Sequence, residues 1–236
     1  MSHLHPTDTT EPHQILHECS NKSMRFIYSD GGPDHQLTYL SVQLSLIALY
    51  LKLELDFLCA ARTPLCHSWR NPAERVMAIV NLGLQCVGQM REKMPEEFEA
   101  AITSSSNLSE LQHTAEKKPD LVPAVQDSIV PVKILLADIT LRLQLQGQNF
   151  QVFSAATQDD MKELFGELEA IDSSLTYGGQ YRRKNLSSFP SLAEFLSHCC
   201  QSRHYYFTIK KCGQHACTIC KPVRMPLEDF KKLSSP

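Results

Sequence analysis

The 236-residue sequence lacks the features that mark secreted, membrane-spanning and repeat proteins. Its first 22 residues are polar, without the basic segment and apolar run of a secretory signal. The most apolar stretch, residues 37–53, is shorter than the roughly 20 residues that a bilayer requires. No internal repeat at a fixed period is found. We therefore expect an intracellular chain with a disordered segment 1–22, a buried helix in 37–53 and no membrane partner.

Cysteine and charge are both unevenly distributed along the chain. The nine cysteines are better interpreted as reduced thiols or metal ligands than as a disulfide framework, because their number is odd and no secretory signal precedes them. From Tyr177 onward there are ten basic and three acidic residues, which leaves a net charge of −10 on the preceding part. A basic tail on an acidic body favours a nucleic-acid partner, although solubilising lysines explain the same charge equally well. Five cysteines lie in the same tail: Cys199, Cys200, Cys212, Cys217 and Cys220.

The order of apolar segments in residues 23–92 predicts an α/β core with parallel strands and helices. Met24 to Ser29 is a short apolar and aromatic run that ends at Asp30-Gly31-Gly32, as a buried strand does. A helix over about 35–52 follows, and residues 55–61 form a second short apolar run. A strand, a helix and a second strand in this order indicate a parallel layer.

Helices are predicted from Asn71 onward. Asn71 can cap the first of them, with Pro72 at its first position, and we expect it to end near Arg91. Residues 93–190 show amphipathic helices and no strand-like run. Pro123 and Pro131 are expected to restrict one helix to 132–145. Thr157 with Asp160 is expected to cap a further helix, and Ser191 with Glu194 forms a predicted capping box for a short one. Residues 191–236 are predicted as a small separate tail.

Asp30 and Glu74 are candidate metal-binding carboxylates. Asp30 lies at the carboxyl end of the first predicted strand, and Glu74 lies in the first turn of the helix after the second. Ligands of open α/β sheets bind just outside the carboxyl ends of strands, and magnesium and manganese prefer carboxylate oxygens. From the residues alone a simpler interpretation is favoured, because Asp-Gly-Gly is a common turn and Glu74 holds a capping-box position.

Two phrases around these carboxylates resemble a known family. "SDGGPDH" at residues 29–35 and "SWRNPAERVMAIVNLGLQ" at residues 68–85 resemble the second and third acidic motifs of DDE-type transposases, and more narrowly those of transposon-derived animal proteins with an RNase H-like core. Weaker similarity is found in "RHYYFTIKKCGQHACTICKP" at 203–222. The resemblance implies a partial RNase H-like fold for 23–92 and Asp30 and Glu74 as catalytic ligands of Mg or Mn. It also implies DNA as the partner, no small-molecule substrate and a nuclear location.

The chain departs from that family ahead of Asp30. The family carries a first aspartate on the first strand of its sheet, whereas here only 29 residues precede Asp30 and the sole aspartate among them is Asp8, in "PTDTTEP". The resemblance therefore implies a truncated enzyme remnant that is inactive as it stands. Asp34 is expected to cap the next helix rather than to replace the missing ligand.

The spacing of three cysteines predicts a zinc site in the tail. Cys212, Cys217 and Cys220 read C-x4-C-x2-C, and the last pair has the spacing at which two thiolates share one zinc ion. His204, His215 and Cys200 are candidates for the fourth ligand, with His204 preferred. A zinc ion would order a tail of about 40 residues that has little core of its own, and the alternative is a partly disordered tail with reduced cysteines.

Basic and aromatic residues of the tail suggest two functions. The predicted phosphate contacts are Arg182, Arg183, Lys210, Lys211 and Arg224. For the aromatic run 205–207, core packing is favoured over base stacking. We expect a transposase-derived, DNA-associated protein with an incomplete metal-dependent nuclease domain. The alternative is a non-enzymatic module that uses the basic, Cys-rich tail to bind nucleic acid or protein.

Overall fold

The described part of the chain forms two compact units. The computed structural model describes residues 22–30, 32, 35–64, 67, 71–88, 90–179 and 181–233, so most of the segment expected to be disordered lies outside it. The sheet unit combines Met1–Glu74 with Phe153–Pro236, and the helical unit is Arg75–Val152. The chain thus leaves the sheet unit, forms the helical unit and returns to the sheet unit. The sequence instead predicts segments that follow one another along the chain without such a return.

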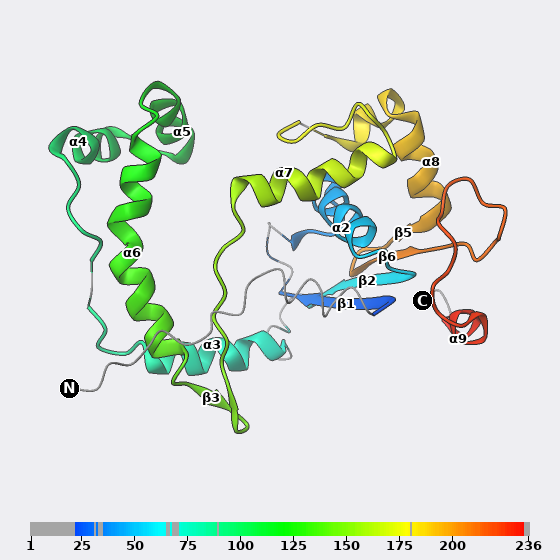
Figure 1. Cartoon of the computed structure of the whole chain (residues 1–236), viewed down its shortest axis with the longest axis horizontal. Helices are drawn as coiled ribbons and strands as arrows, with labels where there is room; N and C mark the ends of the chain where they lie inside the picture. Colours follow the sequence, from blue (N-terminus) through cyan, green and yellow to red (C-terminus); the bar gives the residue numbers. More distant parts are fainter. Residues whose placement is uncertain are drawn as a thin grey trace. The chain divides into compact units, whose positions relative to one another are not determined.

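A mixed four-stranded sheet with the strand order β1-β2-β6-β5 is the centre of the sheet unit (Figure 1). β1 (Met24–Ser29) pairs in parallel with β2 (Phe57–Arg62), and Met24 lies opposite Phe57. α2 (Leu40–Lys52) connects these two strands. The predicted α/β core with a parallel pair is therefore confirmed, and β1 has the predicted bounds.

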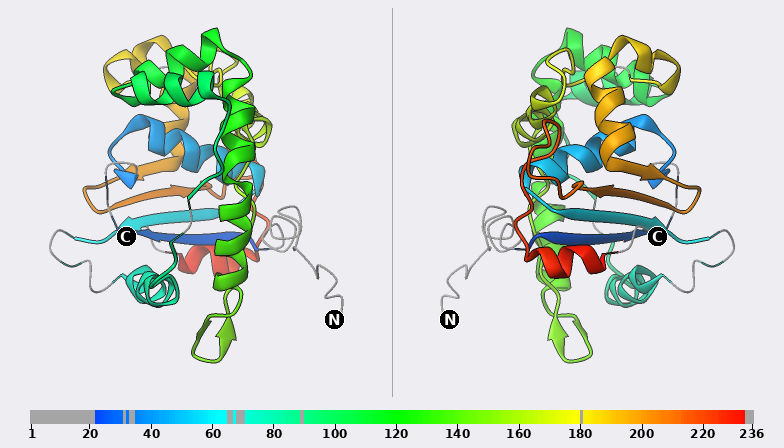
Figure 2. Two further views of the ribbon diagram at one scale, coloured as in Figure 1. Left: turned by 90° about the vertical axis from the view of Figure 1, so that its left-hand side faces the viewer. Right: turned by 90° about the vertical axis from the view of Figure 1, so that its right-hand side faces the viewer.

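Helices cover both faces of this sheet. α2 and α8 (Pro190–Cys199) lie on one face, and the short helix α9 (Leu227–Lys232) lies on the other (Figure 2). The core between α2, α8 and the sheet includes fully buried side chains from every layer, such as Leu44, Leu58, Leu192 and Phe207. α7 (Gln158–Gly166) and η3 (Glu167–Ala170) pack against α2. No helix in the described ranges has both the length and the apolar character needed to cross a bilayer.

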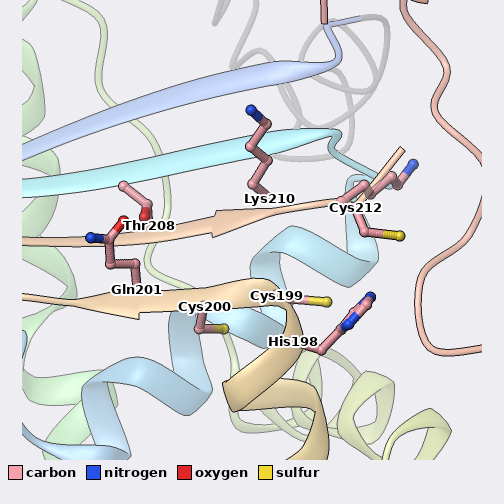
Figure 3. Close-up of a pocket in the computed structure, with 8 residues that line it drawn as sticks. His198, Cys199, Cys200, Gln201, Thr208, Lys210 and Cys212 are labelled. Atoms are coloured by element: carbon pink, nitrogen blue, oxygen red, sulfur yellow. The ribbon is translucent and has the colours of Figure 1, made fainter. Parts of the chain in front are cut away.

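The segment predicted as a separate tail supplies half of the sheet. β5 (Cys200–Ser202) and β6 (Tyr206–Lys210) form an antiparallel hairpin, with Gln201 opposite Thr208 (Figure 3). β6 also pairs antiparallel with β2, so it lies inside the sheet, and its Phe207 and Ile209 are fully buried. The C-terminal cysteines therefore continue from a central strand and share its core.

The helical unit contains α4 (Glu96–Ser104), α5 (Leu108–Lys117), α6 (Leu121–Thr140), most of α3 (Pro72–Gly83) and a hairpin of β3 (Gln144–Leu145) and β4 (Gln148–Asn149). The predicted bounds are wrong for two helices of this unit, and the β3–β4 hairpin lies where no strand was expected. α6 ends at Thr140, before the predicted end at 145. α6 runs through Pro131, at the cost of one backbone hydrogen bond, instead of beginning after it. α3 ends at Gly83, well before Arg91.

Local capping patterns were partly predictive. Asn71 caps α3, because its Oδ1 accepts a hydrogen bond from Ala73 N at 3.1 Å. Thr157 and Asp160 form the expected capping box at the start of α7. The box predicted for Ser191 and Glu194 is absent, since α8 already begins at Pro190 and Ser191 lies inside the helix.

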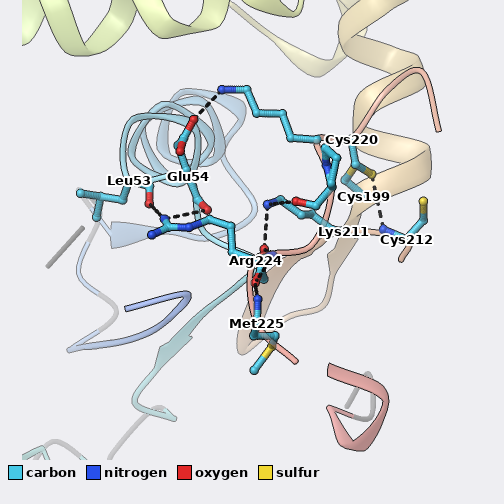
Figure 4. Close-up of polar contacts among 11 residues, drawn as sticks. Leu53, Glu54, Cys199, Lys211, Cys212, Cys220, Arg224 and Met225 are labelled. Carbon is cyan, nitrogen blue, oxygen red and sulfur yellow. Dashed lines mark hydrogen bonds and ion pairs between the residues drawn. The ribbon is translucent and has the colours of Figure 1, made fainter. Parts of the chain in front are cut away.

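A buried carboxylate fastens the C-terminal segment to the start of β2. Asp56 is fully buried and accepts hydrogen bonds from Lys211 Nζ at 2.7 Å, Arg224 N at 3.0 Å and Met225 N at 2.7 Å (Figure 4). Lys211 is only 4% exposed. Because Lys211 and Arg224 flank residues 212–223, one side chain holds both ends of that loop. We call this arrangement the Asp56 clasp.

Asp56→Ala tests the clasp. The substitution leaves the ammonium of Lys211 buried without a counter-charge and removes the acceptor of two backbone N–H groups, so we expect the free energy of unfolding to fall by about 3–5 kcal/mol. Urea unfolding followed by circular dichroism measures the loss. Lys221→Ala is the control, because it removes an exposed 2.8 Å ion pair with Glu54 and should cost less than about 1 kcal/mol. Similar losses in both variants would contradict the clasp.

Candidate metal centre

Three cysteines and one histidine meet at the end of the β5–β6 hairpin. His198 lies in the last turn of α8, and Cys212 lies two residues after β6 (Figure 3). Cys217 and Cys220 follow in the loop that the Asp56 clasp closes. The ligand atoms of these four residues all lie within 4.8 Å of one another. The four residues, which we call the Cys3His cluster, can hold one metal ion such as zinc.

The donor set and its dimensions fit a tetrahedral site. Zinc takes thiolate ligands at about 2.3 Å and imidazole nitrogen at about 2.0–2.1 Å, which places two sulfurs of one site about 3.8 Å apart. The separation of Cys217 Sγ from His198 Nε2 is 3.2 Å, slightly less than such an edge. Small side-chain movements therefore suffice to enclose an ion.

Backbone N–H groups point at the sulfurs. Cys217 Sγ accepts from Ile219 N at 3.4 Å and Cys220 N at 3.3 Å, and these two bonds lower the pKa of Cys217 to about 6. Cys212 Sγ accepts from Gln214 N at 3.4 Å, and Cys220 Sγ accepts from Cys212 N at the same distance. The backbone around Cys217 thus favours its thiolate, the form of cysteine that binds metals.

Gly213 makes the turn after Cys212 possible. Its φ of +77° lies in the left-handed region, where a side chain is strained. A Cβ at this position would also lie 3.0 Å from the ring of Phe230, the buried residue of α9. The first ligand-bearing turn is therefore packed against α9 as well as against the cluster.

Two more thiols lie beside the cluster without belonging to it. Cys199 Sγ is 3.5 Å from Cys220 Sγ, and burial raises the pKa of Cys199 to about 12. Burial also raises the pKa values of Cys200 and Cys220. A bound cation opposes this effect at Cys220, because its charge stabilises the thiolates that coordinate it.

The structure brings His198 to the cysteines, whereas His204 was expected there. His204 lies in the turn between β5 and β6, at the opposite end of β6 from Cys212. Its carbonyl oxygen accepts from Arg62 Nε at 2.9 Å, and its Nε2 accepts from Arg62 Nη2 at 2.8 Å. Neither His215 nor Cys200, the other candidates, belongs to the cluster. An antiparallel hairpin places the residues before β5 next to those after β6, so recognition of residues 200–202 as a strand would have selected His198.

Four of the five predicted phosphate contacts bond to other groups of the protein, and two of these four, Arg183 and Arg224, are nevertheless exposed. Lys211 is buried in the Asp56 clasp and cannot reach a phosphate. Lys210 Nζ donates to the carbonyl of Leu233 and lies 5.1 Å from the centre of the Phe230 ring. The guanidinium groups of the two engaged arginines bond to the chain as follows: Arg183 to Gln43 Oε1 at 2.9 Å, and Arg224 to the carbonyl of Leu53 at 3.2 Å. Arg182 is exposed.

Asp30 and Glu74 lie where the sequence predicted, each in a local turn. Asp30 follows β1, is exposed and accepts a hydrogen bond from Gly32 N at 3.0 Å. Glu74 is exposed in the first turn of α3, and its N–H donates to Asn71 O at 3.1 Å. Neither belongs to a group of three or more metal-binding side chains among the described residues, where the Cys3His cluster is the one such group. Asp34 lies outside the described residues.

No protein-family model, curated protein or solved structure matches this chain. The transposase ancestry therefore stays a prediction from the motifs, whereas the Cys3His cluster is a feature of the structure itself.

Paired histidine substitutions test the ligand set. We expect His198→Ala to weaken zinc binding by more than the roughly 10–100-fold typical of losing an outer-shell partner, because a direct ligand is removed. His204→Ala should leave zinc affinity unchanged, since its side chain pairs with Arg62. Competition with a chromophoric chelator measures both affinities. A larger loss in His204→Ala than in His198→Ala would show that the ligand set is wrong.

Proposed function

We propose that this chain is a DNA-associated protein derived from a DDE-type transposase, and that its Cys3His cluster is a structural zinc centre. The observation that supports the ancestry is the position of the two acidic residues along the β1-α2-β2-α3 series. Asp30 stands at the carboxyl end of β1, and Glu74 stands in the first turn of α3, the helix that follows the parallel neighbour β2. This is the arrangement that the resemblance implies for the second and third acidic residues.

The composition of the cluster supports a structural rather than a catalytic zinc ion. Structural sites are closed by four protein ligands, whereas catalytic sites keep one position for water or substrate. The cluster supplies three sulfurs and one nitrogen within mutual reach, which fills a tetrahedron. The loop 212–223 holds no regular helix or strand, so an ion would order it between the two ends that Asp56 fixes.

The acidic pair alone does not make up the ligand set that strand cleavage requires. Phosphodiester cleavage by two metal ions about 4 Å apart requires carboxylates that hold both ions and commonly bridge them. Within the described residues, Asp30 and Glu74 are not joined by a third ligand in one group. We therefore infer that the chain, as described, retains the scaffold of a nuclease domain without a full ligand set.

Exposed basic residues of the C-terminal half are the proposed phosphate contacts. Arg182 keeps its predicted role, and Lys184 lies exposed beside it in η4 (Arg183–Ser188). Arg203 is exposed in the turn of the β5–β6 hairpin. These side chains replace Lys210 and Lys211, which the fold uses internally. Binding through such contacts weakens as salt rises, because neutralised phosphates release counterions.

A gel assay with supercoiled plasmid and Mg or Mn tests binding and cleavage together. We expect the zinc-loaded chain to retard the plasmid without nicking it, and retardation to fall steeply with salt. The double variant Arg182→Ala/Lys184→Ala should bind more weakly. Lys117→Ala/Lys118→Ala is the control, because it removes two exposed charges from the helical unit, and it should bind like the unmodified chain.

Two outcomes of this assay would contradict the proposal. Absence of retardation at low salt would favour the alternative, a protein-interaction module. Nicking that Glu74→Gln abolishes would show that the acidic pair supports catalysis, so the chain would be an enzyme rather than a remnant.

A further inference from the structure

We propose that Cys199 and Cys220 form a redox-sensitive pair, which hydrogen peroxide converts to a disulfide and thereby withdraws Cys220 from the zinc centre. The proposal rests on the zinc centre inferred above and assigns a means of releasing its ion. Cys220 belongs to the Cys3His cluster, whereas Cys199 does not. One ligand of the ion is therefore shared with a neighbouring thiol.

The distance between the two sulfurs favours their bond. Cys199 Sγ and Cys220 Sγ are 3.5 Å apart, and a disulfide requires about 2.05 Å. The sulfurs need to approach by only about 1.5 Å, which side-chain rotation and a small movement of the loop can supply. Cys199 ends α8 and Cys220 lies in the loop after β6, so the bond would link the helix directly to the loop.

A cavity gives a small oxidant access to this pair. Cys199 and Cys220 both line a cavity of about 170 Å³, together with Tyr50 of α2. This volume exceeds the roughly 30 Å³ that a water molecule occupies in the liquid, so hydrogen peroxide fits.

The reaction balances in two steps. The sulfur of Cys220 attacks one peroxide oxygen, the O–O bond breaks, and the departing hydroxide takes the thiol proton of Cys220, or a proton from solvent where a bound ion would have displaced that proton, to form water. Cys220 is now a sulfenic acid. The sulfur of Cys199 then attacks the sulfur of Cys220, the S–O bond breaks, and the leaving hydroxide takes the thiol proton of Cys199 as a second water. The two sulfurs lose two electrons in total, and the peroxide gains them.

The burial of the two thiols fixes the order of the steps. Cys220 is half-buried, so a peroxide molecule reaches its sulfur before that of Cys199. Cys199 is buried, so it acts as the resolving thiol. After the bond forms, His198, Cys212 and Cys217 remain as ligands and one coordination position is lost. The Asp56 clasp is untouched, so the sheet persists while the loop loses its ion, and reducing thiols reverse the change.

Peroxide titration of the zinc-loaded full chain tests the proposal. A chelating dye follows zinc release, and peptide mapping by mass spectrometry identifies the bond. We expect a Cys199–Cys220 cross-linked peptide to accumulate in parallel with released zinc. Cys199→Ser and Cys199→Ala should bind zinc like the unmodified chain and release it about tenfold more slowly, because the intramolecular thiol is missing. Cys200→Ser, the adjacent half-buried cysteine outside the cluster, is the control and should behave like the unmodified chain.

Two results would overturn the proposal. One is equal zinc release from the Cys199 variants and the unmodified chain. The other is a disulfide among Cys212, Cys217 and Cys220 in place of the Cys199–Cys220 bond. Failure of the proposed zinc centre can be told apart from failure of the redox pair. A chain that binds no zinc before oxidation would refute both the zinc centre and the release of its ion. The peptide map would still decide whether the pair forms a disulfide, because the 3.5 Å separation is present without an ion.

Discussion

The carboxylate of Asp56 joins the two halves of the sheet unit. A buried carboxylate is costly unless its oxygens are fully hydrogen-bonded and its charge is paired, so the chain must bring partners to it. The C-terminal segment supplies these partners twice, first at Lys211 and again at Arg224 and Met225. The loop between these points is thereby closed at its base, and three of the four cluster ligands lie within it. The fourth, His198, lies on α8, which packs on the same sheet.

The Asp56 clasp and the Cys3His cluster contact different parts of the C-terminal segment. Pairing of β6 with β2 buries Phe207 and Ile209, and the clasp fixes the chain where β6 ends. Beyond this point Ile219 and Cys220 pack against the core, and the four ligands of the cluster could hold the loop further around one ion. Under the proposed function, a bound ion would order loop 212–223 in the basic C-terminal half of the chain. The adjoining Cys199 would make that order depend on the redox state of the cell.

Local sequence patterns predicted most of the local structure, whereas they did not predict the contacts between residues far apart in the sequence. The apolar runs at 24–29 and 55–61 indicated two strands, and the helix between them implied their parallel pairing. The first strand was expected to be buried, which is wrong, because β1 is an edge strand with Phe26 68% and Tyr28 48% exposed. β5 has only three residues, Cys-Gln-Ser, with no apolar alternation, so the sequence did not reveal the hairpin that brings His198 to Cys212. Lys211 looks like any surface lysine until Asp56, 155 residues earlier, is placed beside it. Pro131 predicts a helix boundary, yet α6 continues through it. The spacing of Cys217 and Cys220 predicted that both belong to one cluster, because the C-x2-C turn that brings their sulfurs together is formed within four residues.

X-ray absorption at the zinc edge of the zinc-loaded chain tests the central claim most directly, namely that the closed loop and α8 together enclose one ion. The account predicts a first shell of three sulfurs at about 2.3 Å and one nitrogen at about 2.0–2.1 Å, as expected for Cys212, Cys217, Cys220 and His198. A shell of four sulfurs, or one made mainly of oxygen and nitrogen, would contradict it.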